Sequence, residues 1–168
     1  MAKFGKKIMI IGSGGSGKST LAIKLGEILA LPVIHLDKEF WKNDWIKVLK
    51  AEWYEKQKKL VSAQEWIVDG NYTGSLEVRL KAADTVIFLD FGRFTCMRSI
   101  KKRRFSKNQA EINTGNPVKL NRSFVKWVWQ FNSKTRPNII EKLLEYKDIK
   151  IVILKNRKDM KKFIEELL

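Results

Sequence analysis

The sequence predicts an α/β fold in which a parallel sheet is covered by helices on both faces. Five short segments are apolar almost throughout and rich in Ile, Val and aromatic residues, which is typical of strands that are buried on both faces. Helix-period stretches alternate with these segments, and such alternation indicates a parallel sheet with helical crossovers. The predicted strands cover residues 7–11, 33–36, 66–69, 86–90 and 149–154.

Apolar residues at three- and four-residue spacing predict the helices between these strands. One face of the first helix carries Leu21 and Leu25, and the segment 93–104 is expected to turn Phe94 and Ile100 toward the core. The predicted helices cover residues 18–31, 46–61, 93–104 and 122–132, with two more beginning near Pro137 and closing the chain. The segment 106–121 has no clear periodicity and is expected to be a mobile surface loop.

Length and charge limit the class of protein. A chain of 168 residues fits one domain covering 1–168. The net charge of +16, from 34 Lys and Arg against 18 Asp and Glu, points to an anionic partner. That partner could be nucleic acid, a phosphorylated small molecule or a membrane surface. The alternative is a Lys-rich composition without a specific partner, and the charge alone does not decide between them.

Cysteine and hydropathy indicate the compartment. Cys96 has no second cysteine in the chain to pair with, which favours a reducing environment. No apolar run has the length of a signal peptide or a membrane span, so we expect a soluble, cytoplasmic protein without a membrane partner. Cys96 is expected to be inert core, and His35 is expected to be a satisfied strand histidine.

Residues 12–19 match the pattern G-x-x-x-x-G-K-[ST] in full, between a predicted buried strand and a predicted helix. Its glycines let the backbone wrap around a phosphate, and the positive end of the helix adds to the same anion site. Lys18 is expected to contact the outer phosphates, and the Ser19 hydroxyl to hold magnesium. This P-loop predicts ATP and Mg²⁺ as cofactors, bound by Gly12, Ser13, Gly14, Gly15, Ser16, Gly17, Lys18, Ser19 and Thr20.

Carboxylates end three of the predicted strands, at the edge where ligands bind in an open parallel sheet. Asp37 and Asp69 are candidates for the magnesium shell and for accepting the proton of an attacking hydroxyl, whereas Asp90 is better explained as a turn or helix-capping residue. Trp41 and Trp45 follow Asp37 and could wall a pocket for the acceptor; packing is the alternative.

Several stretches together resemble the bacterial DNA topology modulation proteins (FlaR-like). The resemblance spans nearly the whole chain, and its more specific stretches are Asp-Gly-Asn-Tyr at 69–72 and Ala-Asp-Thr-Val-Ile-Phe-Leu-Asp at 83–90. It also rests on the GSGGSGKST loop, His35-Leu36-Asp37 with the two tryptophans behind it, Arg103-Arg104, and the segment from Trp127 and Phe131 to Arg136-Pro137.

That family in turn looks like the adenylate, shikimate and gluconate kinase group of P-loop NTPases. The resemblance implies a three-layer sandwich around a five-stranded parallel sheet in the order 2-3-1-4-5, with a small arginine-bearing lid at about 104–136. It implies that Asp37 acts on the acceptor side, that Asp69 and Gly70 form the carboxylate-glycine pair ending the third strand, and that Asn156 and Arg157 line the nucleobase. Arg103 and Arg104 would stand at the edge of the lid.

The leading hypothesis is a kinase that transfers the γ-phosphate of ATP to a small-molecule or nucleotide acceptor. Lys18 and Asp37 would carry the chemistry with Arg103, Arg104 and Arg136; Asp37, Trp41, Asp69 and Gly70 would bind the acceptor; and Ser19 and Asp69 would hold the metal. Adenylate kinases follow their Asp-Gly with Phe-Pro-Arg, whereas this chain has Asn71-Tyr72-Thr73, which argues against a nucleoside monophosphate acceptor. The alternative is an NTP-dependent, nucleic-acid-associated regulator of DNA topology that binds nucleic acid weakly through the basic run 101–104. A catalytically inactive scaffold is disfavoured because Lys18 and Ser19 are intact.

Overall fold

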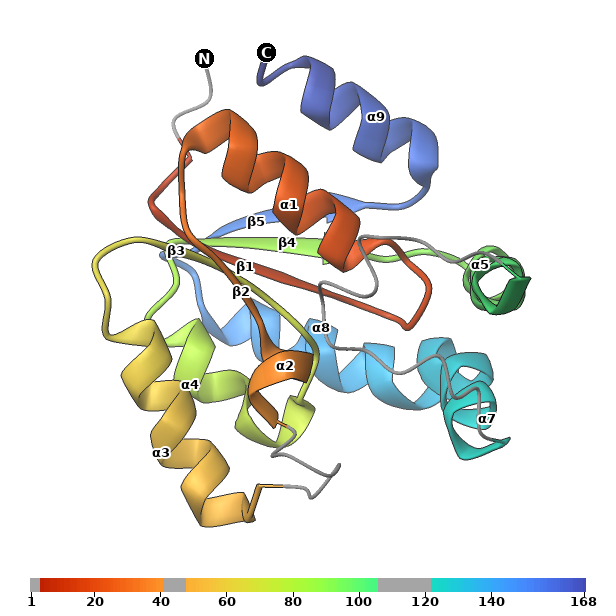
Figure 1. The fold of residues 1–168 in the computed structure, drawn as a ribbon, viewed down its shortest axis with the longest axis horizontal. Helices are drawn as coiled ribbons and strands as arrows, with labels where there is room; N and C mark the ends of the chain where they lie inside the picture. Colours follow the sequence, from red (N-terminus) through yellow and green to blue (C-terminus); the bar gives the residue numbers. More distant parts are fainter. Residues whose placement is uncertain (1–3, 41–47, 106–121) are drawn as a thin grey trace.

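Parallel strands form the sheet, in the order β2-β3-β1-β4-β5 (Figure 1). The structure is a computed structural model that describes residues 4–40, 48–105 and 122–168. The predicted sheet, including its strand order, is therefore confirmed. The strands are β1 (Lys7–Gly12), β2 (Val33–His35), β3 (Trp66–Asp69), β4 (Thr85–Leu89) and β5 (Lys150–Leu154).

The strand limits differ from the predicted ones at two functionally relevant ends. The second predicted strand included Leu36, but this residue begins the short helix α2 (Leu36–Phe40). The fourth was predicted to include Asp90, which instead follows β4. Leu36 is only 1% exposed. Its apolar side chain correctly indicated burial, but burial alone does not distinguish a strand from a helix. Asp37 consequently lies in a helical turn just beyond the sheet.

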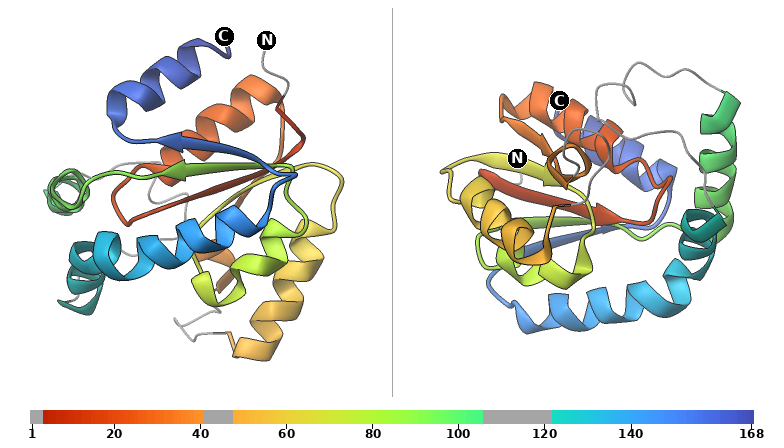
Figure 2. Two further views of the ribbon diagram at one scale, coloured as in Figure 1. Left: turned by 180° about the vertical axis from the view of Figure 1, so that it is seen from behind. Right: turned by 60° about the horizontal axis from the view of Figure 1, so that its bottom comes forward.

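Helices cover both faces of the sheet. In Figures 1 and 2, α1 (Lys18–Leu29) and α9 (Arg157–Glu165) lie on one face. The other face carries α3 (Lys50–Val61), α4 (Leu76–Leu80) and α8 (Arg136–Glu145). None of the described helices is both long enough and apolar enough to cross a bilayer.

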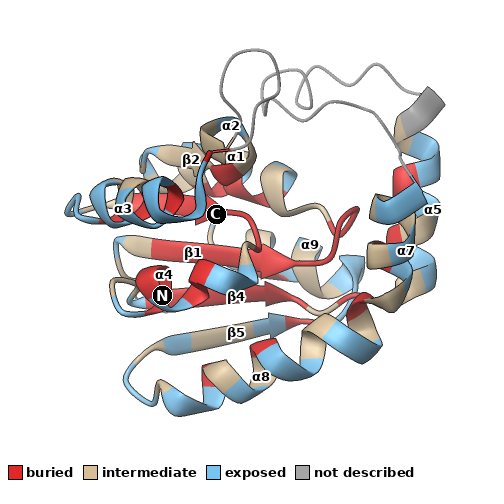
Figure 3. Cartoon of the chain, turned by 90° about the horizontal axis from the view of Figure 1, so that it is seen from below, coloured by how far each residue is buried: buried red, intermediate tan, exposed pale blue. Residues whose placement is uncertain are grey.

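Two further helices lie beyond the carboxyl ends of the central strands (Figures 1 and 3). These are α5 (Arg93–Phe105) and α7 (Arg122–Gln130), and a π-helical turn, Phe131–Thr135, joins α7 to α8. The expected mobile loop at 106–121 lies outside the described residues, and with it about half of the expected lid at 104–136.

The central strand β1 shows why the apolar runs predicted a two-faced sheet. Ile8 and Ile10 pack into the cluster beneath α1 and α9, while Met9 and Ile11 pack into the cluster on the opposite face. All four side chains are 0% exposed, as the red colour of β1 in Figure 3 illustrates. Each contributes about 1.5–3 kcal/mol of burial, so the central strand is a rigid base for the loop that follows it.

The prediction that Phe94 faces the core is wrong, because this side chain is 74% exposed. Helix α5 lies at the end of the sheet and not across its face, so only a narrow strip of it is buried. Cys96 and Ile100 form that strip, and the expectation of a buried Cys96 is confirmed. Burial raises the pKa of its thiol, which makes the group unreactive at neutral pH.

Two P-loop glycines allow α5 and α7 to approach the loop closely. A Cβ at Gly15 would lie 2.6 Å from the carbonyl oxygen of Cys96, and its φ of +79° is one that other residues rarely adopt. A Cβ at Gly14 would lie 2.7 Å from the ring of Phe124. These glycines thus serve helix packing, in addition to the anion binding that the sequence predicts for them.

We expect Gly15→Ala to lower the free energy of unfolding by about 1–3 kcal/mol, because the added methyl group meets backbone atoms that cannot move aside cheaply. Gly74→Ala is the matched control, since nothing lies within 4 Å of a Cβ there. Urea denaturation of both variants measures the difference. Equal stabilities would show that the close packing on Gly15 is not a constraint.

Candidate functional site

The P-loop connects β1 to α1 and has the features of an anion site. Gly17 precedes the helix with a φ of 98°, and α1 begins without a side-chain cap and without an acidic residue in its first turn. The first N–H groups of a helix have no partner within the helix, and they favour negative charge. The N-terminus of α1 is therefore chemically suited to bind a phosphate group.

Lys18 lies folded over this loop. Its Nζ donates hydrogen bonds to the carbonyl oxygens of Gly12 (3.0 Å) and Ser13 (2.9 Å). Burial lowers the pKa of its ammonium group; the carboxylates of Asp37 and Asp69 act against that shift, and Arg103 adds to it. The loop is held closed by Ser16, whose Oγ donates to the Ser13 carbonyl at 2.8 Å.

The Asp69 carboxylate links the P-loop helix to the second strand. Its Oδ2 accepts a hydrogen bond from the Ser19 hydroxyl at 2.6 Å, and its Oδ1 lies 2.7 Å from Nδ1 of His35. The parallel register pairs His35 with Asp69 directly, which explains the second contact. We predicted a satisfied histidine, but the sequence did not indicate that its partner would be Asp69.

Ser19 and Asp69 also fit magnesium by their chemistry. Mg²⁺ prefers oxygen ligands and is usually bound through one or two carboxylates together with phosphate oxygens and water. Within the described residues, no group of three or more His, Cys, Asp or Glu side chains could hold a metal ion. A magnesium ion that binds together with a nucleotide needs only a few ligands from the protein, and the Ser19 hydroxyl and the Asp69 carboxylate can supply them.

Asp37 lies in α2, directly after the second strand. Its Oδ1 accepts a hydrogen bond from the Tyr72 hydroxyl at 2.7 Å. The Tyr72 ring packs against Phe40 and Trp53, with centroid distances of 4.9 and 5.0 Å, and these two rings also contact each other. Burial, followed by the negative charge of Asp37, raises the pKa of Tyr72, so the phenol stays a neutral donor to Asp37.

The loop after β3 touches both halves of the site, and the sequence did not predict these contacts. Asn71 Oδ1 accepts a hydrogen bond from the Gly12 N–H at 2.9 Å. Arg79 is 0% exposed, and its guanidinium donates to the carbonyl oxygens of Gly70 (2.7 Å), Asn71 and Tyr72 (3.1 Å). Burial lowers the pKa of Arg79 to about 9, so the group still carries its charge at neutral pH. A charged residue within Leu76–Leu80 gives no sequence signal of such burial.

The remaining predicted arginines are placed at different points. Arg136 makes a bidentate pair with Asp90, with Nε to Oδ1 at 2.7 Å and Nη2 to Oδ2 at 2.8 Å. Arg103 is half-buried in α5, close enough to Lys18 to lower its pKa. Trp41 and Trp45 lie outside the described residues, as does the side chain of Arg104.

Asn156 and Arg157, predicted to lie beside the nucleobase, follow β5. Asn156 is the N-cap of α9, and its Oδ1 accepts from the backbone N–H groups of Lys158 and Asp159. Arg157 donates from Nη2 to Ser99 Oγ at 2.8 Å, and its Nη1 would lie 3.9 Å from a Cβ at Gly17. Arg157 is therefore next to the P-loop, while the cap accounts for the Asn156 side chain.

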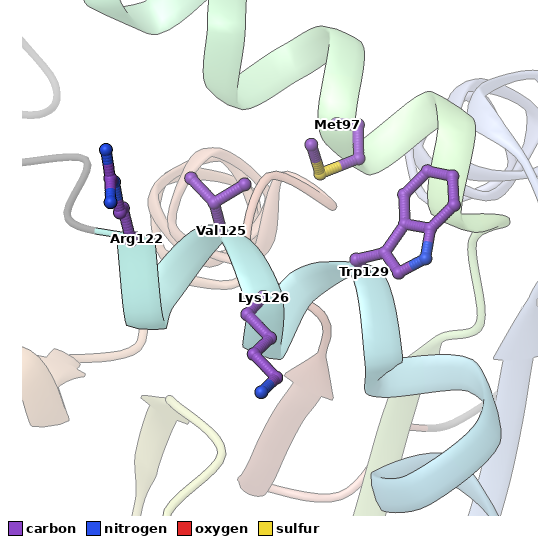
Figure 4. A pocket seen from close by; sticks show the side chains of 5 residues that line it. All are labelled: Met97, Arg122, Val125, Lys126 and Trp129. Atoms are coloured by element: carbon purple, nitrogen blue, oxygen red, sulfur yellow. The ribbon is translucent and has the colours of Figure 1, made fainter.

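A separate apolar pocket of about 350 Å³ lies between α5 and α7 (Figure 4). Met97, Val125 and Trp129 form its walls, with Arg122 and Lys126 at its edges. It shares no residue with the predicted site.

Sheet order, P-loop position and strand-end carboxylates define a P-loop kinase fold. Solved structures of kinases share it. A gluconokinase from Sinorhizobium meliloti 1021 is 12% identical, with a TM-score of 0.60 over 99% of this chain and 91% of its own. A shikimate kinase from Acinetobacter baumannii, solved with shikimate, is 13% identical, with a TM-score of 0.61 over 95% of this chain and 89% of its own.

A deoxyadenosine kinase from M. mycoides is 18% identical, with a TM-score of 0.51 over 95% of each chain. No protein-family model matches the chain, and no curated protein matches it. At these identities the likeness is one of fold.

We expect Arg136→Ala to lower the free energy of unfolding by ~1 kcal/mol, because it leaves the Asp90 carboxylate without its bidentate partner. The value is set low because the Arg136 side chain is 40% exposed, where solvent screens the pair. Arg98→Ala, at an exposed position of α5, is the matched control. Thermal unfolding of both variants tests the pair, and an Arg136 variant as stable as the control would contradict it.

Proposed function

We propose that this protein is an ATP- and Mg²⁺-dependent kinase that phosphorylates a hydroxyl group on a small acceptor. The observation that carries the proposal is the hydrogen bond between the Asp69 carboxylate and the hydroxyl of Ser19 in the P-loop helix, next to Lys18 in the chain. The Lys18 ammonium group interacts with Asp37 and with Asp69. The kinase names of the structural neighbours support the same class and favour it over a nucleic-acid-associated regulator.

On the nucleotide side, the site would use the P-loop and the N-terminus of α1. The Gly12 N–H stays bonded to Asn71, and backbone N–H groups within residues 13–20 would bind the phosphates. Lys18 would exchange its two carbonyl acceptors for the outer phosphate oxygens. Magnesium, when bound, supplies charge neutralisation on the phosphates, and Ser19 and Asp69 would hold it. The hydrogen bond from His35 would then orient Asp69 toward the metal. Asn156 and Arg157 would border the nucleobase.

The acceptor side is built around Asp37. A carboxylate that orients an attacking hydroxyl and accepts its proton is the expected general base in phosphoryl transfer. The Tyr72 hydroxyl fixes Asp37 Oδ1 by donating to it, and Oδ2 would receive the acceptor. Two neighbouring carboxylates repel an anionic acceptor, so we infer that the group phosphorylated is a neutral hydroxyl and not a phosphate. Gly70 and Trp41 would line this pocket.

Arg103, Arg104 and Arg136 would stabilise the transferring phosphoryl group, with Arg136 released from Asp90 when it does so. The range 104–136 would act as the lid of a single cytoplasmic domain. The motifs at 69–72 and 83–90 support membership of the FlaR-like family. Turnover of ATP against a panel of small hydroxyl and phosphate acceptors tests the proposed class, and phosphorylation of a phosphate acceptor alone would contradict the acceptor assignment.

We expect Lys18→Ala to raise the free-energy barrier to phosphoryl transfer by ~2–4 kcal/mol, because it removes a positive charge from beside the outer phosphates. The fold should remain intact, since the side chain bonds only to loop carbonyls. Single-turnover kinetics beside a circular dichroism melt separates these effects. Unchanged turnover in the folded variant would remove Lys18 from the chemistry.

Substitutions of Asp37 and Asp69 are expected to affect different steps of the proposed reaction. Asp37→Asn should suppress transfer while Mg-ADP affinity changes little, because the residue lies on the acceptor side. Asp69→Asn should weaken the magnesium dependence of ADP binding. Calorimetry with and without Mg²⁺ distinguishes them, and equal losses of Mg-ADP affinity in both variants would overturn this division of roles.

A further inference from the structure

Arg79 is a buried cation whose acceptors are backbone carbonyl groups. Its side chain is 0% exposed, and in the described part of the chain its Nε finds no acceptor. Burying a charge costs several kcal/mol, and an apolar side chain of similar size is often at least as stable in such a place. Core stability alone is therefore a weak explanation for an arginine at this position.

The carbonyl groups that Arg79 binds belong to a backbone that leaves the sheet. They are those of Gly70, Asn71 and Tyr72, three consecutive residues. Gly70 has a φ of +137° and Tyr72 a φ of +37°, which is uncommon for a residue with a side chain. A guanidinium has donors in a fixed fork, so it can hold several carbonyl groups in one arrangement.

Side chains of the same three residues reach the two halves of the proposed site. Asn71 Oδ1 accepts from the N–H of Gly12, the first residue of the P-loop, at 2.9 Å. Tyr72 donates to Asp37 at 2.7 Å, and its ring is packed against Phe40 and Trp53. A shift of this loop would therefore move the P-loop contact and the Asp37 contact together.

We propose that Arg79 is a positioning residue that couples the P-loop to the acceptor-side carboxylate by fixing residues 70–72. The proposal rests on the proposed function for the roles of the P-loop and Asp37, but the contacts that link them through residues 70–72 are structural. Arg79 touches neither end: it acts through Asn71 on the nucleotide side and through Tyr72 on the acceptor side. Ordering one end should then order the other.

Backbone amide exchange measured by NMR tests the link without requiring turnover. Asn71→Ala should speed exchange at Gly12 only, and Tyr72→Phe in Leu36–Phe40 only, because each breaks one branch. Arg79→Met should speed exchange in both places by about tenfold, the effect expected when one charge-assisted hydrogen bond is lost. Thr85–Leu89 in β4 serves as the internal reference.

Val78→Ala is the matched control, because it removes buried volume from the same helix while leaving the hydrogen bonds of Arg79 to residues 70–72 in place. It should destabilise the protein while leaving the ratio of exchange at Gly12 to exchange in β4 unchanged. Arg79→Lys, which keeps the charge but not the fork, should give a smaller effect in both places. It also replaces Arg79→Met as the test variant if the latter does not fold.

Mg-ADP affinity gives a second readout. Arg79→Met should weaken Mg-ADP binding by about tenfold. Adding Asn71→Ala to the Arg79→Met variant should weaken it little further, because the contact of Asn71 with Gly12 is already loosened. The link is overturned if the Arg79 variants behave like Val78→Ala, or if the two changes add fully. Absence of phosphoryl transfer to any acceptor would contradict the proposed function and leave these binding and exchange results to judge the link.

Discussion

The parallel register of three strand ends is the constraint on which the site depends. β1 lies between β3 and β4, so Ile10 is opposite Asp69 and Gly12 is opposite Leu89. Since all strands run in one direction, polar residues that end β2 and β3 lie beside the loop that ends β1. A slip of one residue would turn the Asp69 side chain to the other face of the sheet and separate it from Ser19.

The sequence predicted the parts of this arrangement that depend on local patterns. β3 was predicted at its exact limits because its residues are buried on both faces, and the P-loop was predicted because its glycines and lysine have a fixed spacing. α2 and α4 have five residues each, too few to show a helical period, and they were missed. Phe94 was misplaced because an apolar helical stripe does not reveal how much of it the neighbouring elements cover.

Contacts between distant segments could not be predicted in the same way. The contact of His35 with Asp69 requires the register of two strands that are 34 residues apart. The burial of Arg79 requires knowing that the carbonyl groups of residues 70–72 converge on its guanidinium, and arginine is usually exposed. The first contact follows once strand order and register are known, so resemblance to a kinase sheet could have indicated it. The second depends on the path of the loop after β3, which strand order does not specify.

The distribution of charge within the site differs from that of the surface. The chain carries +16 overall, yet the charges that act on Lys18 include those of two carboxylates, Asp37 and Asp69. A site evolved only to attract polyanions would place cations there, because a nearby carboxylate weakens phosphate binding. Carboxylates beside a phosphate-binding lysine are useful where a metal ion must be held and a hydroxyl must lose its proton. The two carboxylates within a basic protein therefore fit the phosphoryl transfer that we propose.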